Sequence, residues 1–208
     1  TVDTVSGQNY AFSTGSLNIV SSSTLNIRNS TLTITGTSGT LFTRGGTFTV
    51  GGTSTTVFSG NGDTTLNSGT ITFDGMTNSG TGAKNVGNNI TVADALTLSA
   101  GVLDLNGSNL TNTGGSFVNN ATLRLQGGET LTGFTNDVDT GIVDYDGSGT
   151  YSSGLVAGDA YNDLTFSGSG TWTLDAALDA NDAITISAGT LDVSGTNYGI
   201  TVGGDWTD

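Results

Sequence analysis

Apolar and polar residues alternate with a period of two along most of the chain. Pairs of apolar residues two positions apart, such as Leu17 with Ile19 and Leu103 with Leu105, are bounded by Gly, Asn, Ser or Asp. This alternation predicts short β-strands with one buried face, and no window of ten residues has the period of an amphipathic helix. The first three pairs begin seven or eight residues apart, so one coil of three strands takes about 20–24 residues.

A long internal repeat organises these strands. Residues 94–110 return at 182–198, an offset of 88 residues, and the match keeps both the alternation and the Gly positions. A repeated unit of this kind buries its apolar face only against its neighbours. We therefore predict an all-β fold, a right-handed parallel β-helix (β-solenoid) of about nine or ten triangular coils, with a length of roughly 45 Å at the usual strand spacing.

The absence of proline favours this architecture. The chain has 34 Gly and no Pro. Proline lacks the N–H that a strand ladder needs, and a ribbon of stacked coils has edges only at its two ends. Gly supplies positive φ at the turns, and we expect Asn29, Asn109 and Asn197 to do so as well while bonding to the neighbouring coil.

No composition break divides the chain, so residues 1–208 are predicted to form a single β-solenoid domain. Within it we expect a divergent module at 1–63 and two related modules at 64–127 and 149–208. Residues 128–148 are acidic and interrupt the strand rhythm, which predicts an irregular segment. We expect the chain to be mature or excised from a longer protein, and neither TVDTVSGQNY nor GITVGGDWTD has the pattern of a capping helix.

Charge is distributed unevenly. Residues 1–124 hold five acidic residues and all four basic residues, Arg28, Arg44, Lys84 and Arg124, for a net charge of −1. Residues 125–208 hold thirteen acidic residues and no base, a net charge of −13. Such a field repels nucleic acid and anionic membranes. The chain also has no Cys, which excludes a disulfide scaffold, and no apolar stretch near the ~18–20 residues of a membrane helix.

Four aspartates are the only candidate site. Asp144 and Asp146 lie two positions apart, so both face one side of a strand, and Asp137 and Asp139 precede them. Paired carboxylates bind Ca²⁺ or serve as the acid and base of a glycosidase, but the leading interpretation is that they decorate a solvated turn. Ca²⁺ is therefore the one weak cofactor candidate. No catalytic residue is assigned, because the acidic half has no base and the chain has no His. We expect no enzyme.

Threonine and tryptophan carry weaker signals. Thr-x-Thr triplets such as Thr31, Thr33 and Thr35 are typical of β-strands, and the sequence shows no repetition of Thr at a fixed column, so an ice-binding surface is not predicted. Trp172 and Trp206 are expected to be strand residues, buried or stacked between coils, rather than sugar platforms.

Two segments carry a resemblance. Residues 164–175 (LTFSGSGTWTLD) and 184–207 (ITISAGTLDVSGTNYGITVGGDWT) resemble the tandem modules of very large surface proteins of uncultured candidate-phyla bacteria. More broadly, the chain resembles haemagglutinin-like and autotransporter-passenger β-solenoids. The resemblance implies an extracellular or cell-surface location and a stalk, adhesin or fibre role, and it carries no catalytic residues.

These observations lead to one main expectation about function. We expect an extracellular structural protein, a subunit or segment of a self-assembling filament whose copies stack head to tail. The alternative is a stalk or ligand-binding segment of a large bacterial adhesin, and the third is a carbohydrate-active β-helix enzyme. The expected partner is a second copy of the chain, with cell-surface or glycan contacts as further candidates, and neither nucleic acid nor a membrane span is expected.

Overall fold

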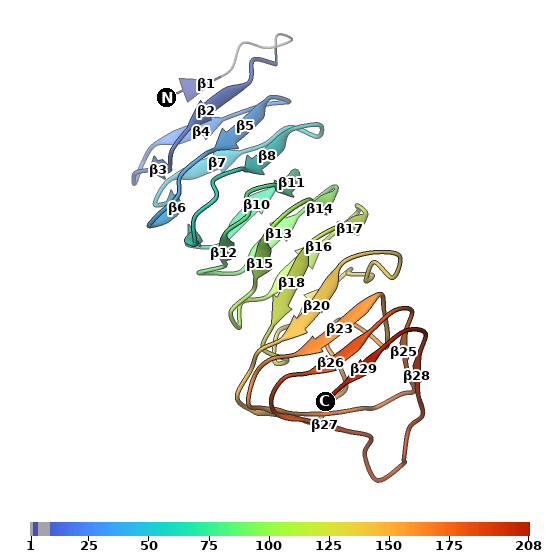
Figure 1. Cartoon of the computed structure of the whole chain (residues 1–208). Coiled ribbons are helices and arrows are strands. Elements are labelled where there is room, and N and C mark those ends of the chain that lie inside the picture. The colour runs from blue at the N-terminus through green and yellow to red at the C-terminus, as the bar shows by residue number, and fades with distance from the viewer. Residues whose placement is uncertain (1, 4–8) are drawn as a thin grey trace.

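The strands follow one another around a common axis and pair in parallel with the strands of the next turn (Figure 1). This computed structural model describes residues 2–3 and 9–208, and these contain no helix. The predicted class is confirmed: an all-β parallel solenoid of about ten turns. Most of the N-terminal segment TVDTVSGQNY lies outside the described residues.

Each turn crosses three faces. The first face is a single sheet of ten strands, called here the long sheet. It consists of β3 (Leu17–Ile19), β6 (Thr40–Arg44), β9 (Thr64–Ser68), β12 (Ala83–Asn85), β15 (Val102–Asp104), β18 (Thr122–Leu125), β20 (Ile142–Tyr145), β23 (Asp163–Phe166), β26 (Ile184–Ile186) and β29 (Trp206–Thr207).

The second face, which follows the long sheet in each turn, is divided into three sheets. They are β1 (Val2–Asp3), β4 (Thr24–Asn26) and β7 (Thr47–Thr49); then β10 (Ile71–Phe73), β13 (Ile90–Val92), β16 (Leu110–Asn112) and β19 (Leu131–Thr132); then β21 (Thr150–Tyr151), β24 (Thr171–Thr173) and β27 (Thr190–Asp192).

The third face leads back to the long sheet and is divided into two sheets. They are β2 (Phe12–Thr14), β5 (Thr31–Ile34), β8 (Thr55–Phe58), β11 (Gly75–Asn78), β14 (Leu96–Leu98) and β17 (Phe117–Asn119); then β22 (Ala160–Tyr161), β25 (Leu178–Ala180) and β28 (Ile200–Val202).

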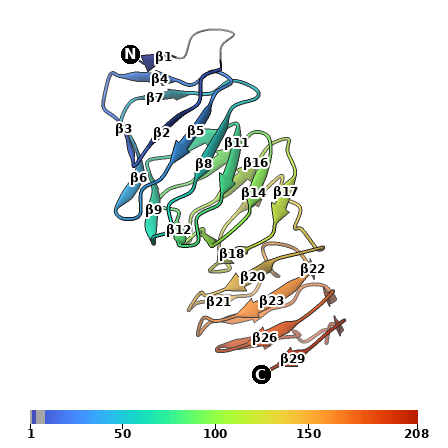
Figure 2. The ribbon, with the colours of Figure 1, turned by 45° about the horizontal axis from the view of Figure 1, so that its top comes forward.

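The register gives the length of a turn. Leu103 pairs with Leu123 and Leu123 with Val143, so these two consecutive turns are equally long. The turn from Ile71 to its partner Ile90 is slightly shorter, and the turn from Leu17 to Phe42 is the longer extreme. The coil length predicted from the strand spacing therefore describes the solenoid closely, and its longest turns lie at the N-terminal end (Figure 2).

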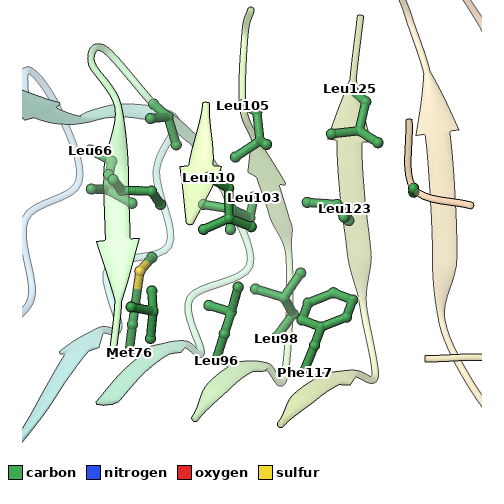
Figure 3. Packing of buried hydrophobic residues seen from close by; sticks show 14 of the residues in the cluster. Leu66, Met76, Leu96, Leu98, Leu103, Leu105, Leu110, Phe117, Leu123 and Leu125 are labelled. Atoms are coloured by element: carbon green, nitrogen blue, oxygen red, sulfur yellow. The ribbon is translucent and has the colours of Figure 1, made fainter. Parts of the chain in front are cut away.

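The core is built of columns of like residues. Met76, Leu96 and Phe117 are register partners in consecutive turns and lie in a row along the interior (Figure 3). Leu103 and Leu123 continue a second column from the long sheet. Each fully buried Leu contributes about 2 kcal/mol of transfer free energy, so these columns stabilise every turn against the next.

Two of the expected turn residues behave differently from the prediction. Asn197 has positive φ as predicted, but Asn29 and Asn109 do not. In these two turns the residues with positive φ are Arg28, beside Asn29, and Asn106, three residues before Asn109. Asn109 does bond to the next turn, because its Oδ1 accepts the N–H of Thr130 at 2.8 Å. The turn chemistry was therefore right in kind, and the positive-φ position lies elsewhere in these two turns.

The predicted repeat is present strand by strand but is rotated. β11, β12, β13 and β14 begin 88 residues before β23, β24, β25 and β26. However, β11 and β14 belong to the third face, whereas β23 and β26 belong to the long sheet. Residues 133–141 cross the third face without forming a strand, which displaces the second copy of the repeat by one face. The long sheet itself continues through the acidic segment from β18 to β20.

One corner of the solenoid is a stack of glycines. A Cβ on Gly80 would overlap the carbonyl oxygen of Gly60, and a Cβ on Gly60 would overlap that of Gly36. Real Cβ atoms do not approach backbone this closely, so the turns stack at this spacing only because these residues have no side chain.

We predict that Gly80→Ala lowers the free energy of unfolding by about 2–4 kcal/mol, since the clash is with backbone that cannot move without breaking the ladder. Gly195→Ala is the matched control, because a Cβ added there would have no atom within 4 Å. Chemical denaturation of both variants measures the difference; equal stability would contradict the stacking constraint.

One core column contains a lysine. Lys84 is fully buried and pairs in register with Thr64 on one side and Leu103 on the other. Its Nζ donates to the carbonyl oxygens of Gly62 at 3.0 Å and Gly82 at 3.2 Å. Its position in the second copy of the repeat is occupied by Trp172, 88 residues later. Sequence reasoning counted Lys84 only as a charge.

Lys84→Met is predicted to raise stability at pH 7 by about 1 kcal/mol, because it removes a buried charge and keeps the volume. Burial lowers the pKa of Lys84 from its ordinary 10.5, although the charge of Asp63 raises it. A lowered folded-state pKa makes the native protein more stable as the pH rises through that pKa toward 10.5. The advantage of the variant, measured by denaturation at pH 7 and pH 10, should therefore shrink; a constant advantage would show that charge is not the cause.

Candidate functional site

Charged residues form consecutive rungs on the outer side of the long sheet. Asp104 on β15, Arg124 on β18 and Asp144 on β20 are register partners in three successive turns. Asp146 follows β20 directly. These four residues, called here the Arg124 cluster, include the two aspartates that sequence spacing placed on one side of a strand.

Arg124 lies at the centre of the cluster. Its Nε is 2.9 Å from Asp144 Oδ2 and 3.9 Å from Asp146 Oδ2, and its Nη1 is 4.0 Å from Asp104 Oδ2. The second oxygen of Asp144 accepts a hydrogen bond from Ser167 Oγ at 2.7 Å. Asp144 is 5% exposed, so it is an ion-paired and shielded carboxylate rather than the solvated side chain that we expected.

The cluster carries more negative than positive charge. Burial, followed by the charge of Asp104, raises the pKa of Asp146 to about 6; Arg124 lowers it, and Asp144 and Glu129 raise it further. Burial also raises the pKa of Asp104, against the opposing effects of the Asn106 N–H and Arg124. One arginine thus faces three aspartates.

Asp137 and Asp139 have a different role. Asp137 accepts the N–H of Asn119 through Oδ2 at 2.8 Å and the N–H of Asp139 through Oδ1 at 3.0 Å. Both lie in the strandless segment that crosses the third face. The four candidate calcium ligands are therefore used in two separate arrangements, one around Arg124 and one around Asn119.

Among residues 2–3 and 9–208, no group of three or more His, Cys, Asp or Glu side chains is arranged to hold a metal ion. No helix in the same residues is long and apolar enough to cross a membrane.

Glu129 is a structural carboxylate that sequence reasoning missed. It is buried, its Oε1 accepts the N–H groups of Gln126 at 2.7 Å and Gly107 at 3.1 Å, and its Oε2 accepts that of Gly127 at 2.8 Å. It therefore closes its own turn and ties it to the preceding one. The Gly-Gly that precedes Glu129 was the available signal, since such a turn leaves several N–H groups to be satisfied.

The two tryptophans differ. Trp172 is fully buried, stacks on Tyr151 at a ring-centroid distance of 5.6 Å and donates through Nε1 to the carbonyl oxygen of Gln126 at 3.0 Å. It is the core residue that was predicted. Trp206, in the last strand, is 47% exposed.

The threonine prediction was wrong in one respect. Thr72, Thr91, Thr111 and Thr132 are register partners in four successive turns of the second face, so a fixed column does exist. It is one residue wide on these strands, because Asn89 and Asn109 beside it accept backbone N–H groups of the next turn. The varying turn length hid this column in the sequence. Shorter columns occur at Thr150, Thr171 and Thr190 of the second face and at Thr165, Thr185 and Thr207 of the long sheet. Narrow columns on short strands need no cause beyond the β-propensity of threonine.

No family model, no curated protein and no solved structure matches the chain. The resemblance to bacterial surface proteins is therefore supported at the level of the β-solenoid fold, and the specific group stays a prediction.

We predict that Asp146→Asn raises the melting temperature at pH 7.5. The folded-state pKa of about 6 lies above the ordinary 3.8, so the native state binds a proton that the unfolded state does not, and the protein gains stability as pH falls from about 6 toward 4. The benefit of the variant should therefore disappear near pH 4. Asp179→Asn, at an exposed position of β25, is the control. A benefit that does not change between pH 4 and 7.5 would contradict this assignment.

Proposed function

We propose that the chain is a structural rod that lengthens by stacking one coil on another, as a subunit of an extracellular filament. The fold is compatible with a structural or adhesin-like role at a surface. The observation that supports assembly is that core columns are more open to solvent at the two ends. Leu17 is only partly buried and Trp206 is exposed, whereas their register partners one turn further in, Phe42 and Ile184, are fully buried.

At the C-terminal end, the open residues continue the core columns. Ile184 is fully buried, but its register partner Trp206 is 47% exposed. Leu191 and Val193, and Ile200 with Val202, are only partly buried. One more turn would cover them in the way that each inner turn is covered.

At the N-terminal end of the described residues, a surface hollow lies beside β3, the first strand of the long sheet. It has a volume of about 210 Å³ and lies between β3 and β4, with Leu17, Ile19 and Leu25 in its lining. Val20 beside it is 56% exposed. Trp206 lies on β29, the strand at the opposite end of the same long sheet.

Strand direction favours head-to-tail stacking. The free edges at the C-terminal end are β27, β28 and β29, and those at the N-terminal end are β1, β2 and β3. Each face of one end therefore meets the same face of the other end, with parallel strands throughout. A two-fold junction between identical ends would instead require antiparallel pairing.

Charge favours the same arrangement. Residues 1–49 contain Arg28, Arg44 and one acidic residue, Asp3, a net charge of +1, whereas residues 181–208 contain four aspartates and no base, a net charge of −4. Head-to-tail contact brings opposite charges together, and contact between two C-terminal ends opposes like charges.

The adhesin alternative differs only in the source of the next coil. In a stalk, that coil belongs to the same polypeptide, and the same apolar columns are covered by neighbouring sequence. The extracellular location is inferred from the resemblance. An enzyme is the weakest proposal, since the cation nearest the paired carboxylates, Arg124, is engaged by Asp144 at 2.9 Å.

The test uses one blocking variant at each end. Trp206→Glu places a charge at the C-terminal junction and Val20→Glu at the N-terminal one, and each should leave the chain monomeric in sedimentation while the wild type forms fibres by electron microscopy. An equimolar mixture of the two variants retains one intact junction per pair and should form dimers only.

Ile142→Lys is the control, because Ile142 is an exposed apolar residue on β20, far from both ends. It should assemble like the wild type. Dimers formed by Val20→Glu alone would show a two-fold junction between C-terminal ends. A monomeric wild type at high concentration would favour the stalk.

A further inference from the structure

The two copies of the repeat are joined by one sheet out of three. The long sheet passes from β18 to β20 and on to β23, and these strands lie one after another along the rod (Figures 1 and 2). On the second face, one sheet ends at β19 and another begins at β21; on the third, one ends at β17 and another begins at β22. Two of the three ladders are therefore interrupted at the same level.

Side chains replace the missing ladders. On the third face, Asn136 Nδ2 donates to the carbonyl oxygen of Ala160 at 2.9 Å, and Asn181 Nδ2 donates to that of Val138 at 2.7 Å. Near the second face, the indole N–H of Trp172 reaches Gln126. Each of these bonds depends on one rotamer, whereas a ladder repeats along a strand.

Both interruptions are hollow. A surface hollow of about 310 Å³ lies between the turn at Gly127–Glu129 and β21, with Tyr151 in its lining. Another of about 280 Å³ lies between residues 134–138 and 157–160. The surface of the rod is therefore indented at the two places where a strand pair would otherwise continue the ladder.

The Arg124 cluster lies on the long sheet, the one face whose ladder is continuous at this level. Arg124 on β18 and Asp144 on β20 belong to the two strands that meet at this level, and Asp104 and Asp146 extend the contact to either side. The pair is the charged link across the outer surface of the single continuous ladder.

We propose that residues 126–161 form a joint at which the rod bends and opens before its regular turns do. The long sheet acts as the hinge of this joint, and the ion pairs of Arg124 hold the joint closed. The joint lies between the two copies of the repeat, at the level where residues 133–141 cross the third face without forming a strand and the second copy begins one face later. Segments with fewer ladder bonds and contacts open at lower free energy than the rest of a fold.

The experiment measures distances across and away from the joint by electron paramagnetic resonance. The chain has no Cys, so two introduced cysteines carry spin labels at unique sites. Asp94→Cys with Asp175→Cys spans four turns across the joint, and Thr31→Cys with Ser116→Cys spans four turns within the first half. All four positions lie near the corner between the second and third faces, opposite the hinge, and none is buried. Both pairs should give mean distances near 19 Å, at about 4.8 Å per turn.

The expected result is a distance distribution about twice as wide for the pair that spans the joint. Arg124→Gln should widen it further and leave the other pair unchanged. Arg44→Gln is the matched control, because Arg44 bonds to the carbonyl oxygen of Thr70 in the first half. All measurements are made on the Trp206→Glu background, so that assembly does not affect the widths.

If the two pairs give distance distributions of equal width in the protein that retains Arg124, the proposed joint does not exist. If Arg44→Gln and Arg124→Gln broaden the distance distribution across the joint equally, Arg124 does not hold the joint closed. Neither outcome depends on whether copies of the chain stack end to end.

Discussion

Parallel hydrogen bonding between consecutive turns is the constraint on which the rest of the structure depends. It brings each residue to about 4.8 Å from its partners one turn before and after. Each residue of a column therefore has to fit against the residues at the same position of the neighbouring turns. The constraint is tightest at the corners. At Gly36, Gly60 and Gly80 a single methyl group would overlap a carbonyl oxygen of the preceding turn.

The same constraint organises the side chains outside and inside the coil. Outside, a column of equal charges is costly, and Arg124 stands between Asp104 and Asp144 in register. Inside, Lys84 interrupts a column whose neighbouring members are uncharged, and it is retained by two carbonyl oxygens of the glycine-rich corner. In the second copy of the repeat the corresponding residue, Trp172, fills this position with an aromatic ring.

A solenoid also has consequences at its ends and at its irregular levels. End turns lack one neighbour, so columns that are closed in the interior stay open, as at Trp206. At residues 126–161 two faces lose their ladders together, and side-chain hydrogen bonds and the Tyr151–Trp172 stack take over. A rod made of repeated units is thus uniform along its turns and distinctive only where units begin, end or change face.

The sequence by itself determined the local features of this protein. Period-2 alternation identified strands such as the one at Leu103, because inward and outward positions follow from neighbours in the chain. Strand spacing predicted three-stranded coils, and the internal repeat predicted a quasi-one-dimensional fold.

Only the tertiary structure decided which residues of different turns meet. The turns differ in length, as the pairings of Ile71 with Ile90 and of Leu17 with Phe42 show. The contacts of Arg124 with its three aspartates, the threonine column of the second face and the burial of Lys84 therefore depend on a register that is set by packing and by each corner. The face on which the repeat returns was decided in the same way, by a strandless segment at 133–141 whose displacement is visible only once the coil is closed.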